Sequence, residues 1–137
     1  MDSTDQQILA VLTKNGRITM KELGEKVHLT GQAAAARVAR LEEKGIIENY
    51  TVKLNHALLG YGVHALITVY NYSLLHQSYL DFIQTQTEYV RHNYKVSGNG
   101  CYILECRFPS TAALDTFLSA LSKHTNYNVS IVLNDVL

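Results

Sequence analysis

A row of polar and basic residues between positions 30 and 44 has the chemistry to bind nucleic acid. A hydroxyl and an amide at its start can reach phosphates or base edges, and the cations farther along can pair with phosphates. The alanines between them offer only small apolar contacts, for example to a thymine methyl, so we expect modest direct readout of bases. The candidate DNA-binding residues are Thr30, Gln32, Ala33, Ala36, Arg37, Arg40 and Lys44.

Residues for catalysis or metal binding do not form a recognisable constellation. We find no Ser-His-Asp or Cys-His arrangement with a local motif, no glycine loop for phosphates and no paired carboxylates on a common face. No HxxxH or CxxC spacing is present, so we expect no catalytic residue, no metal and no cofactor. The six histidines stand at positions 28, 56, 64, 76, 92 and 124.

Two short helices are expected to precede the row and to support it. Asp2 or Ser3 can cap the first helix, which runs to about Asn15 and ends at a left-handed Gly16. The segment Thr19-Met-Lys-Glu22 has the form of a capping box, in which the hydroxyl and the carboxylate each satisfy a free backbone amide. This segment predicts the start of the second helix.

A third helix is expected to present the row itself. Thr30 is a good N-cap for a helix from Gly31 to about Lys44, which Gly45 closes. The residues at helical spacing that should be buried are Ala34, Val38 and Leu41. The segment from Ile46 to Leu54 has an extended pattern, which predicts a strand or a short hairpin.

The second half of the chain changes from helical to alternating periodicity after Gly62. Gly98-Asn99-Gly100 between two predicted strands is a strong hairpin signal. The predicted order is strand, helix, strand, strand, helix, strand, which is the ferredoxin-like split βαβ arrangement. The strands are predicted over residues 64–70, 89–97, 101–108 and 128–133, and the helices over 75–86 and from Pro109-Ser110 onward.

Composition bounds the size and the compartment of the protein. The chain has 137 residues with twelve basic and twelve acidic side chains, so any DNA-binding surface must be local. Cys101 and Cys106 would lie on opposite faces of one strand and cannot bridge each other within it. No apolar stretch could span a bilayer and no signal-peptide pattern is present, so we expect a cytoplasmic protein.

Pattern alone leaves two interpretations of the helical part open. A helix-turn-helix would place its second helix in the major groove, N-terminus first. An ordinary three-helix bundle with a solvated basic face would show the same periodicity. Helical triplets are common, so periodicity favours neither interpretation.

The order and spacing of further residues resemble the signature of the Lrp/AsnC (leucine-responsive regulator) family. The resemblance covers all of the first 60 residues and continues more weakly through the rest of the chain. The matching segments are Asp2-x-x-Asp5-x-x-Ile8-Leu9, Gly16-Arg17-Ile18, Glu22-Leu23, Leu29-Thr30, Arg37-Val38-x-x-Leu41-Glu42, Gly45-Ile46-Ile47-x-x-Tyr50 and Leu59-Gly60.

The resemblance implies an α+β protein of two parts that regulates transcription by binding double-stranded DNA. It implies a winged helix-turn-helix over residues 1–50, a linker over 51–60 and a ferredoxin-like βαββαβ assembly and effector domain over 61–137. Gly31–Lys44 would be the recognition helix. Members of the family form homodimers that often assemble further, for example into octamers, and many respond to amino acids, so we expect these partners here.

Several residues depart from the family pattern. His28 stands where glycine is usual in the turn and must tolerate a left-handed conformation. Gly31 replaces a common proline, and the alanine run replaces hydroxyl residues often used on the reading face. Sequence preference therefore cannot be carried over from relatives.

One segment resembles the loop that the family uses to bind effectors. It consists of Gly98, Asn99, Gly100, Cys101 and Tyr102. Cys101 takes the position where Asp is usual, and a neutral thiol is a weaker partner than a carboxylate for an ammonium group. Two interpretations stay open: a ligand-sensing loop that uses backbone amides, and a plain tight hairpin at a subunit interface. For the thiol itself, a buried inert group is a better interpretation than a redox sensor.

An enzyme is the alternative function. Sirohaem decarboxylases resemble the same two-part architecture and act on a tetrapyrrole with pocket His and Arg residues. The candidates here would be His64, Arg91, His92 and Arg107. The capped third helix with its basic side argues against an enzyme.

The tyrosines of the second half could form a platform that stacks RNA bases. The basic residues that accompany such a platform are missing there.

Overall fold

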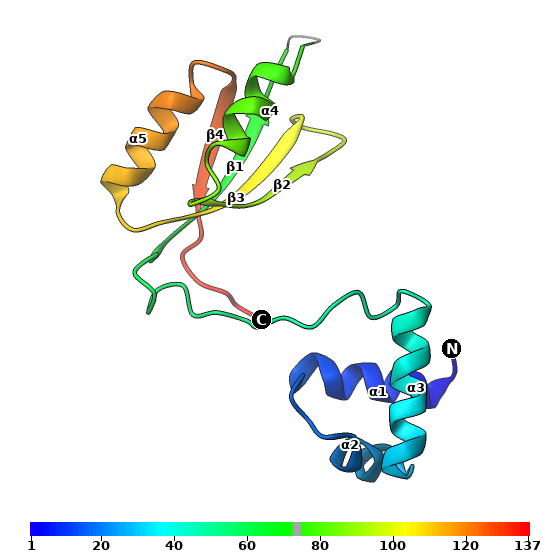
Figure 1. Cartoon of the computed structure of the whole chain (residues 1–137). Helices are drawn as coiled ribbons and strands as arrows, with labels where there is room; N and C mark the ends of the chain where they lie inside the picture. The colour runs from blue at the N-terminus through cyan, green and yellow to red at the C-terminus, as the bar shows by residue number, and fades with distance from the viewer. Residues whose placement is uncertain (73–74) are drawn as a thin grey trace. The chain divides into compact units, whose positions relative to one another are not determined.

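Three capped helices form the first of two units, residues 1–53, in the computed structural model, which describes residues 1–72 and 75–137. The helices are α1 (Ser3–Lys14), α2 (Met20–Val27) and α3 (Gly31–Glu43) (Figure 1). Asp2, Thr19 and Thr30 each accept a hydrogen bond from the backbone amide three residues on, so the predicted caps are confirmed. The reciprocal capping box, however, forms at Asp2 and Asp5.

The turn between α2 and α3 is tight because His28 adopts a left-handed conformation and Gly24 lets the backbone approach closely. His28 adopts the predicted left-handed conformation, with φ 61° and ψ 43°. The Leu29 amide donates to the Gly24 carbonyl at 2.8 Å. A Cβ on Gly24 would lie 2.5 Å from the Leu29 carbonyl oxygen, so only glycine fits at this close approach. The two helices pack on a core that includes Ile8, Leu23 and Ala34, all with no exposed surface.

Two predictions for the flanking segments are wrong. Gly16 is not left-handed; α1 ends instead through Asn15, whose amide donates to the Val11 carbonyl at 3.0 Å. The strand or hairpin expected over residues 46–54 does not form among the described residues. The Ile46 and Ile47 amides both donate to the Leu41 carbonyl, and residues 48–54 pair with no strand in the described part of the chain.

The second unit, residues 54–137, contains a four-stranded antiparallel sheet in the order β2-β3-β1-β4. Its elements in chain order are β1 (Val63–Tyr70), α4 (Gln77–Gln84), β2 (Val90–Lys95), β3 (Tyr102–Phe108), α5 (Thr111–Leu121) and β4 (Asn126–Ile131). This is the predicted ferredoxin-like βαββαβ fold. Helix α4 is shorter at both ends than predicted, and β4 begins two residues earlier.

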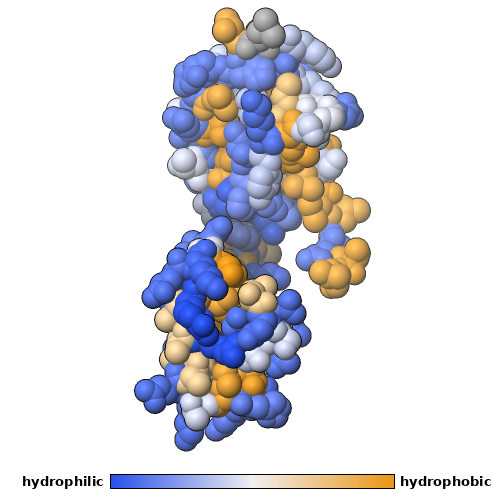
Figure 2. All heavy atoms as spheres, turned by 90° about the vertical axis from the view of Figure 1, so that its right-hand side faces the viewer, coloured by the Kyte–Doolittle hydropathy of each residue, from blue (hydrophilic) through white to orange (hydrophobic). Residues whose placement is uncertain are grey.

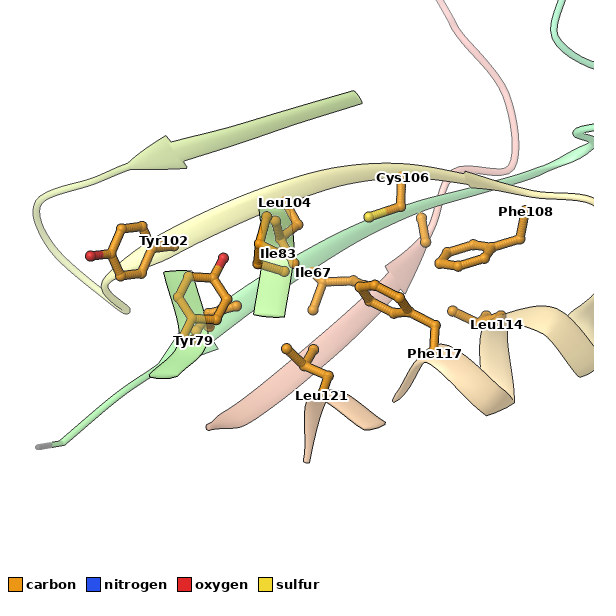
Figure 3. Close-up of a cluster of buried hydrophobic side chains, with 12 residues drawn as sticks. Ile67, Tyr79, Ile83, Tyr102, Leu104, Cys106, Phe108, Leu114, Phe117 and Leu121 are labelled. Carbon is orange, nitrogen blue, oxygen red and sulfur yellow. The ribbon is translucent and has the colours of Figure 1, made fainter. Parts of the chain in front are cut away.

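Both helices of this unit lie on one side of the sheet (Figure 1). Alternate residues of β1 and β3 meet α4 and α5 in the core shown in Figure 3. The other sheet face carries His64, Leu66, Ile103 and Glu105, and no helix of the described residues covers it. Figure 2 shows that apolar side chains remain at the surface between polar ones. None of the helices in the described segments is long and apolar enough to cross a membrane.

Candidate functional site

Helix α3 carries one buried and one exposed side. Ala34, Val38 and Leu41 are buried, as predicted. Gln32, Ala36, Arg40 and Lys44 are exposed on the rest of its surface, and Ala33 is half-buried. The Thr30 hydroxyl accepts the Ala33 amide at 3.1 Å and thereby holds the first turn of the helix. The structure therefore brings most of the candidate DNA-binding row to solvent.

Two exposed cations, Arg40 in α3 and Lys44 at its C-cap, are available to pair with phosphates. The ion pairs found among residues 1–72 and 75–137 include neither Arg40 nor Lys44. Glu42, near the end of α3, accepts a hydrogen bond from the Tyr50 hydroxyl at 2.6 Å. That hydrogen bond raises the pKa of Tyr50 to about 12.

Arg37 differs from the other members of the row, because its guanidinium binds inside its own unit. Its Nη1 atom lies 2.6 Å from Asp2 Oδ2 and 3.3 Å from Asp5 Oδ1. The Arg37 side chain is 25% exposed. Its hydrogen bond to Asp2 holds the pKa of that carboxyl at about 2 and raises the pKa of the guanidinium. Sequence reasoning gave this residue a place in the DNA-binding row and missed its two acidic partners.

The loop of Gly98 to Tyr102 is a tight connection between β2 and β3. Gly98 and Gly100 have φ values of 101° and 104°. A Cβ on Gly100 would lie 2.7 Å from Thr68 Cγ2, so the backbone of the loop approaches β1 closely. The Cys101 amide donates to the Val69 carbonyl at 2.8 Å, and its half-buried thiol lies 3.5 Å from the Asn71 carbonyl oxygen.

The side chain of Tyr102, at the end of this loop, is buried in the core. It is 5% exposed, and its ring lies 4.8 Å from that of Tyr79 (Figure 3). Its hydroxyl lies 3.0 Å from His76 Nδ1, next to the start of α4. The Tyr79 hydroxyl in turn donates to Asn93 at 2.8 Å. Sequence analysis assigned no role to His76 or Asn93, because His76 meets Tyr102, and Asn93 meets Tyr79, only once α4 packs on the sheet.

Two of the four candidate enzyme residues, His64 and His92, lie near Glu105 on the sheet face without helices. His64 Nε2 lies 2.7 Å from Glu105, and His92 Nε2 lies 3.9 Å from it. Arg107 is the register partner of His64, while Arg91 donates to the Glu88 carbonyl and lies 5.4 Å from the Tyr61 ring centre. The arrangement is a carboxylate held by imidazoles.

Burial makes one of the two thiols unreactive. Cys101 and Cys106 are both free, and burial raises the pKa of Cys106 to about 12. That pKa keeps the Cys106 thiol protonated and inert at neutral pH. In the part of the chain that the structure describes, no group of three His, Cys, Asp or Glu side chains could hold a metal ion.

Two family models match the chain. The model described as winged helix-turn-helix DNA-binding matches residues 1–48, and the model described as Lrp/AsnC ligand binding domain matches residues 75–137. The transcriptional regulator LrpA of Bacillus subtilis is 53% identical over 133 residues, which cover 97% of this chain and 98% of LrpA. The regulator LrpB of the same organism is 36% identical over 99% of this chain and 91% of its own length.

Solved structures show the same likeness. Bacillus subtilis LrpC superposes with a TM-score of 0.90 and 26% identity, covering 99% of this chain and 96% of LrpC. A transcriptional regulator from Neisseria meningitidis in complex with L-methionine superposes with a TM-score of 0.88 and 29% identity, covering 100% of this chain and 92% of the other. These relatives are regulators, which is consistent with a protein that is not an enzyme.

Proposed function

The chain belongs to the Lrp/AsnC family of transcription regulators, and from that premise we propose that α3 is the helix that reads double-stranded DNA. The observation that carries the proposal is the division of α3 into a buried apolar side and an exposed side with two free cations. A recognition helix enters the major groove with its N-terminal residues against base edges. The DNA-binding part is residues 1–50, joined by residues 51–60 to the part from 61 to 137.

The residues of α3 take different roles in this proposal. Thr30 contacts phosphate near the start of the helix, and Gln32 hydrogen-bonds to base edges. Arg40 and Lys44 contact phosphates farther along. Ala33 and Ala36 make apolar contacts with thymine methyl groups, so readout depends in part on DNA shape.

A second copy of the chain is the proposed protein partner. Tyr50, Val52 and Leu54 alternate along the extended segment and are 55%, 73% and 50% exposed. On the sheet face without helices, Leu66 and Tyr94 are 38% and 52% exposed. Covering these groups in a symmetric homodimer would pair two recognition helices with half-sites roughly 34–36 Å apart, and further assembly to an octamer would add avidity.

We propose an amino acid as the effector of the second unit. The Lrp/AsnC ligand binding domain model spans residues 75–137 and so includes the loop from Gly98 to Tyr102. The Neisseria regulator and a feast or famine regulatory protein of Mycobacterium tuberculosis were both solved with L-methionine. In this chain Cys101 stands in the loop, so an amino acid would be held there by backbone groups. The two free thiols fit a cytoplasmic protein.

A DNA-binding titration tests the proposal. The DNA upstream of the gene for this protein is compared with a shuffled control at two salt concentrations, with and without L-methionine. We expect salt-dependent binding that prefers the native DNA. Arg40→Ala should reduce the slope of log affinity against log salt by about 0.9, the value for one lost phosphate contact. Gln32→Ala should reduce the preference for native over shuffled DNA.

A different experimental result would refute each part of the proposed function. Equal binding of both DNAs by the wild-type protein at every salt concentration would refute sequence-preferring regulation. An unchanged salt slope in Arg40→Ala would refute the proposed docking face. Identical titrations with and without L-methionine, in a protein that binds DNA, would remove only the effector.

A further inference from the structure

We propose that Arg37 is a positioning residue, which anchors α3 to the start of α1 and masks two carboxylates from the DNA, and that it contacts no phosphate. The proposal rests on the proposed role of α3 as the recognition helix. It separates Arg37 from Arg40 and Lys44, which belong to the same helix.

The geometry of the Asp2–Asp5–Arg37 cluster supports the anchoring role. A single nitrogen of Arg37 lies within hydrogen-bonding distance of both carboxylates, at 2.6 Å and 3.3 Å. The same carboxylates form the capping box of α1: Asp2 accepts the Asp5 amide at 2.9 Å, and Asp5 accepts the Asp2 amide at 3.3 Å. Arg37 therefore joins the middle of α3 to the first turn of α1, and Figure 1 draws the N-terminus beside α3.

The positive charge of Arg37 also offsets the negative charge of the two carboxylates. Asp5 is 15% exposed and Asp2 56% exposed, and both carboxylates lie beside the helix that the proposal places against DNA. Without a cation between them, they would repel the phosphate backbone at close range. Arg37 is already neutralised by this pair. A phosphate contact through Nη1 would require Arg37 to give up two charge-assisted hydrogen bonds, and one through its other nitrogens would bring the phosphate toward the two carboxylates. Arg40 has no such ion pair within residues 1–72 and 75–137.

The test compares Arg37→Met with Arg40→Met in the full chain. Methionine keeps an unbranched apolar stem and removes the guanidinium, with its charge and its hydrogen-bond donors. We expect Arg40→Met to reduce the salt slope by about 0.9, and Arg37→Met to leave the slope within about 0.3 of wild type. We also expect Arg37→Met to weaken binding to native and shuffled DNA alike, by about two- to fivefold, which is typical of a lost exposed ion pair.

Two further measurements separate positioning from phosphate contact and from simple misfolding. Without DNA, amide hydrogen exchange in the first turn of α1 should be faster in Arg37→Met and unchanged in Arg40→Met. In the Arg37→Met background, Asp2→Asn and Asp5→Asn together should restore DNA affinity, because asparagine can still cap α1 but bears no charge.

The outcomes distinguish this inference from the proposed function. If Arg37→Met lowers the salt slope as much as Arg40→Met, Arg37 is a phosphate contact and the inference is overturned. If the two asparagine substitutions restore no affinity, the masking role is overturned. If the wild-type protein binds no DNA at low salt, the proposed role of α3 fails. In that case, slower or equal exchange in the first turn of α1 would still overturn the anchoring role of Arg37.

Discussion

Gly24→Ala should destabilise the first unit even though alanine is the better helix former. In a helix interior, alanine is favoured over glycine by about 0.8–1.0 kcal/mol. At this position the new Cβ would lie 2.5 Å from the Leu29 carbonyl oxygen and 2.9 Å from that of Thr30. Both obstacles are backbone atoms, so no side-chain rotation can relieve the overlap.

The overlap should outweigh the gain in helix propensity. Overpacking costs typically about 1–3 kcal/mol, and contacts this short with rigid backbone belong at the upper end. The net loss should therefore be about 2 kcal/mol, the difference between about 3 and about 1. If the backbone moves to relieve the overlap, the hydrogen bond from Leu29 to Gly24 lengthens and Thr30, which caps α3, shifts. The preference for native DNA should therefore fall as well.

Segment-resolved amide hydrogen exchange measures this effect separately in each unit. We expect faster exchange in α1, α2 and α3 of Gly24→Ala, with the second unit unchanged. Gly16→Ala is the matched control, because the nearest atom to its new Cβ would be the Leu12 carbonyl oxygen at 3.9 Å, an ordinary contact. Helices of Gly24→Ala that exchange as slowly as those of the wild type, or an equally destabilised Gly16→Ala, would contradict the expected overlap at Gly24.

Two other substitutions test local features of the first unit. His28→Gly should raise its thermal midpoint, corresponding to up to about 1 kcal/mol, because glycine adopts the left-handed region without the cost of a Cβ; a lower midpoint would show that the His28 side chain stabilises the turn. The hydrogen bond to Glu42 raises the pKa of Tyr50 from 10.0 to about 12, so the stability from this bond is complete below pH 10 and lost as pH rises through about 12. Unfolding curves across this pH range should fall more steeply for wild type than for Tyr50→Phe, and parallel curves would contradict the assignment.

Local rules predicted the parts of the fold that depend on neighbours in the sequence. The caps at Thr19 and Thr30 and the left-handed His28 follow from residue type and position within a few residues. The strand expected over residues 46–54 failed for the opposite reason. A strand needs a partner, and an alternating apolar pattern does not reveal whether that partner belongs to the same chain.

In the candidate site, too, the contacts of single side chains depend on residues that are distant in the sequence. Arg37 and Arg40 are both cations on α3, and nothing within a few positions distinguishes them. The difference comes from Asp2 and Asp5, which lie more than thirty residues earlier. Tyr102 likewise follows the glycine loop in sequence, yet the alternation of β3 turns its ring into the core.

Removing Arg37 from the phosphate contacts has a consequence for assembly. Helix α3 then contributes Arg40 and Lys44, and two phosphate contacts give a salt slope of only about 1.8 for one copy. Its direct readout is also weak, because Gln32 is flanked by alanines. Binding that prefers particular DNA therefore needs several copies, since linking two heads makes the second binding event intramolecular and can raise affinity by about 10²–10⁴-fold. The proposed assembly through the exposed segment around Val52 and the open sheet face therefore matters for the proposed DNA recognition as much as α3 itself.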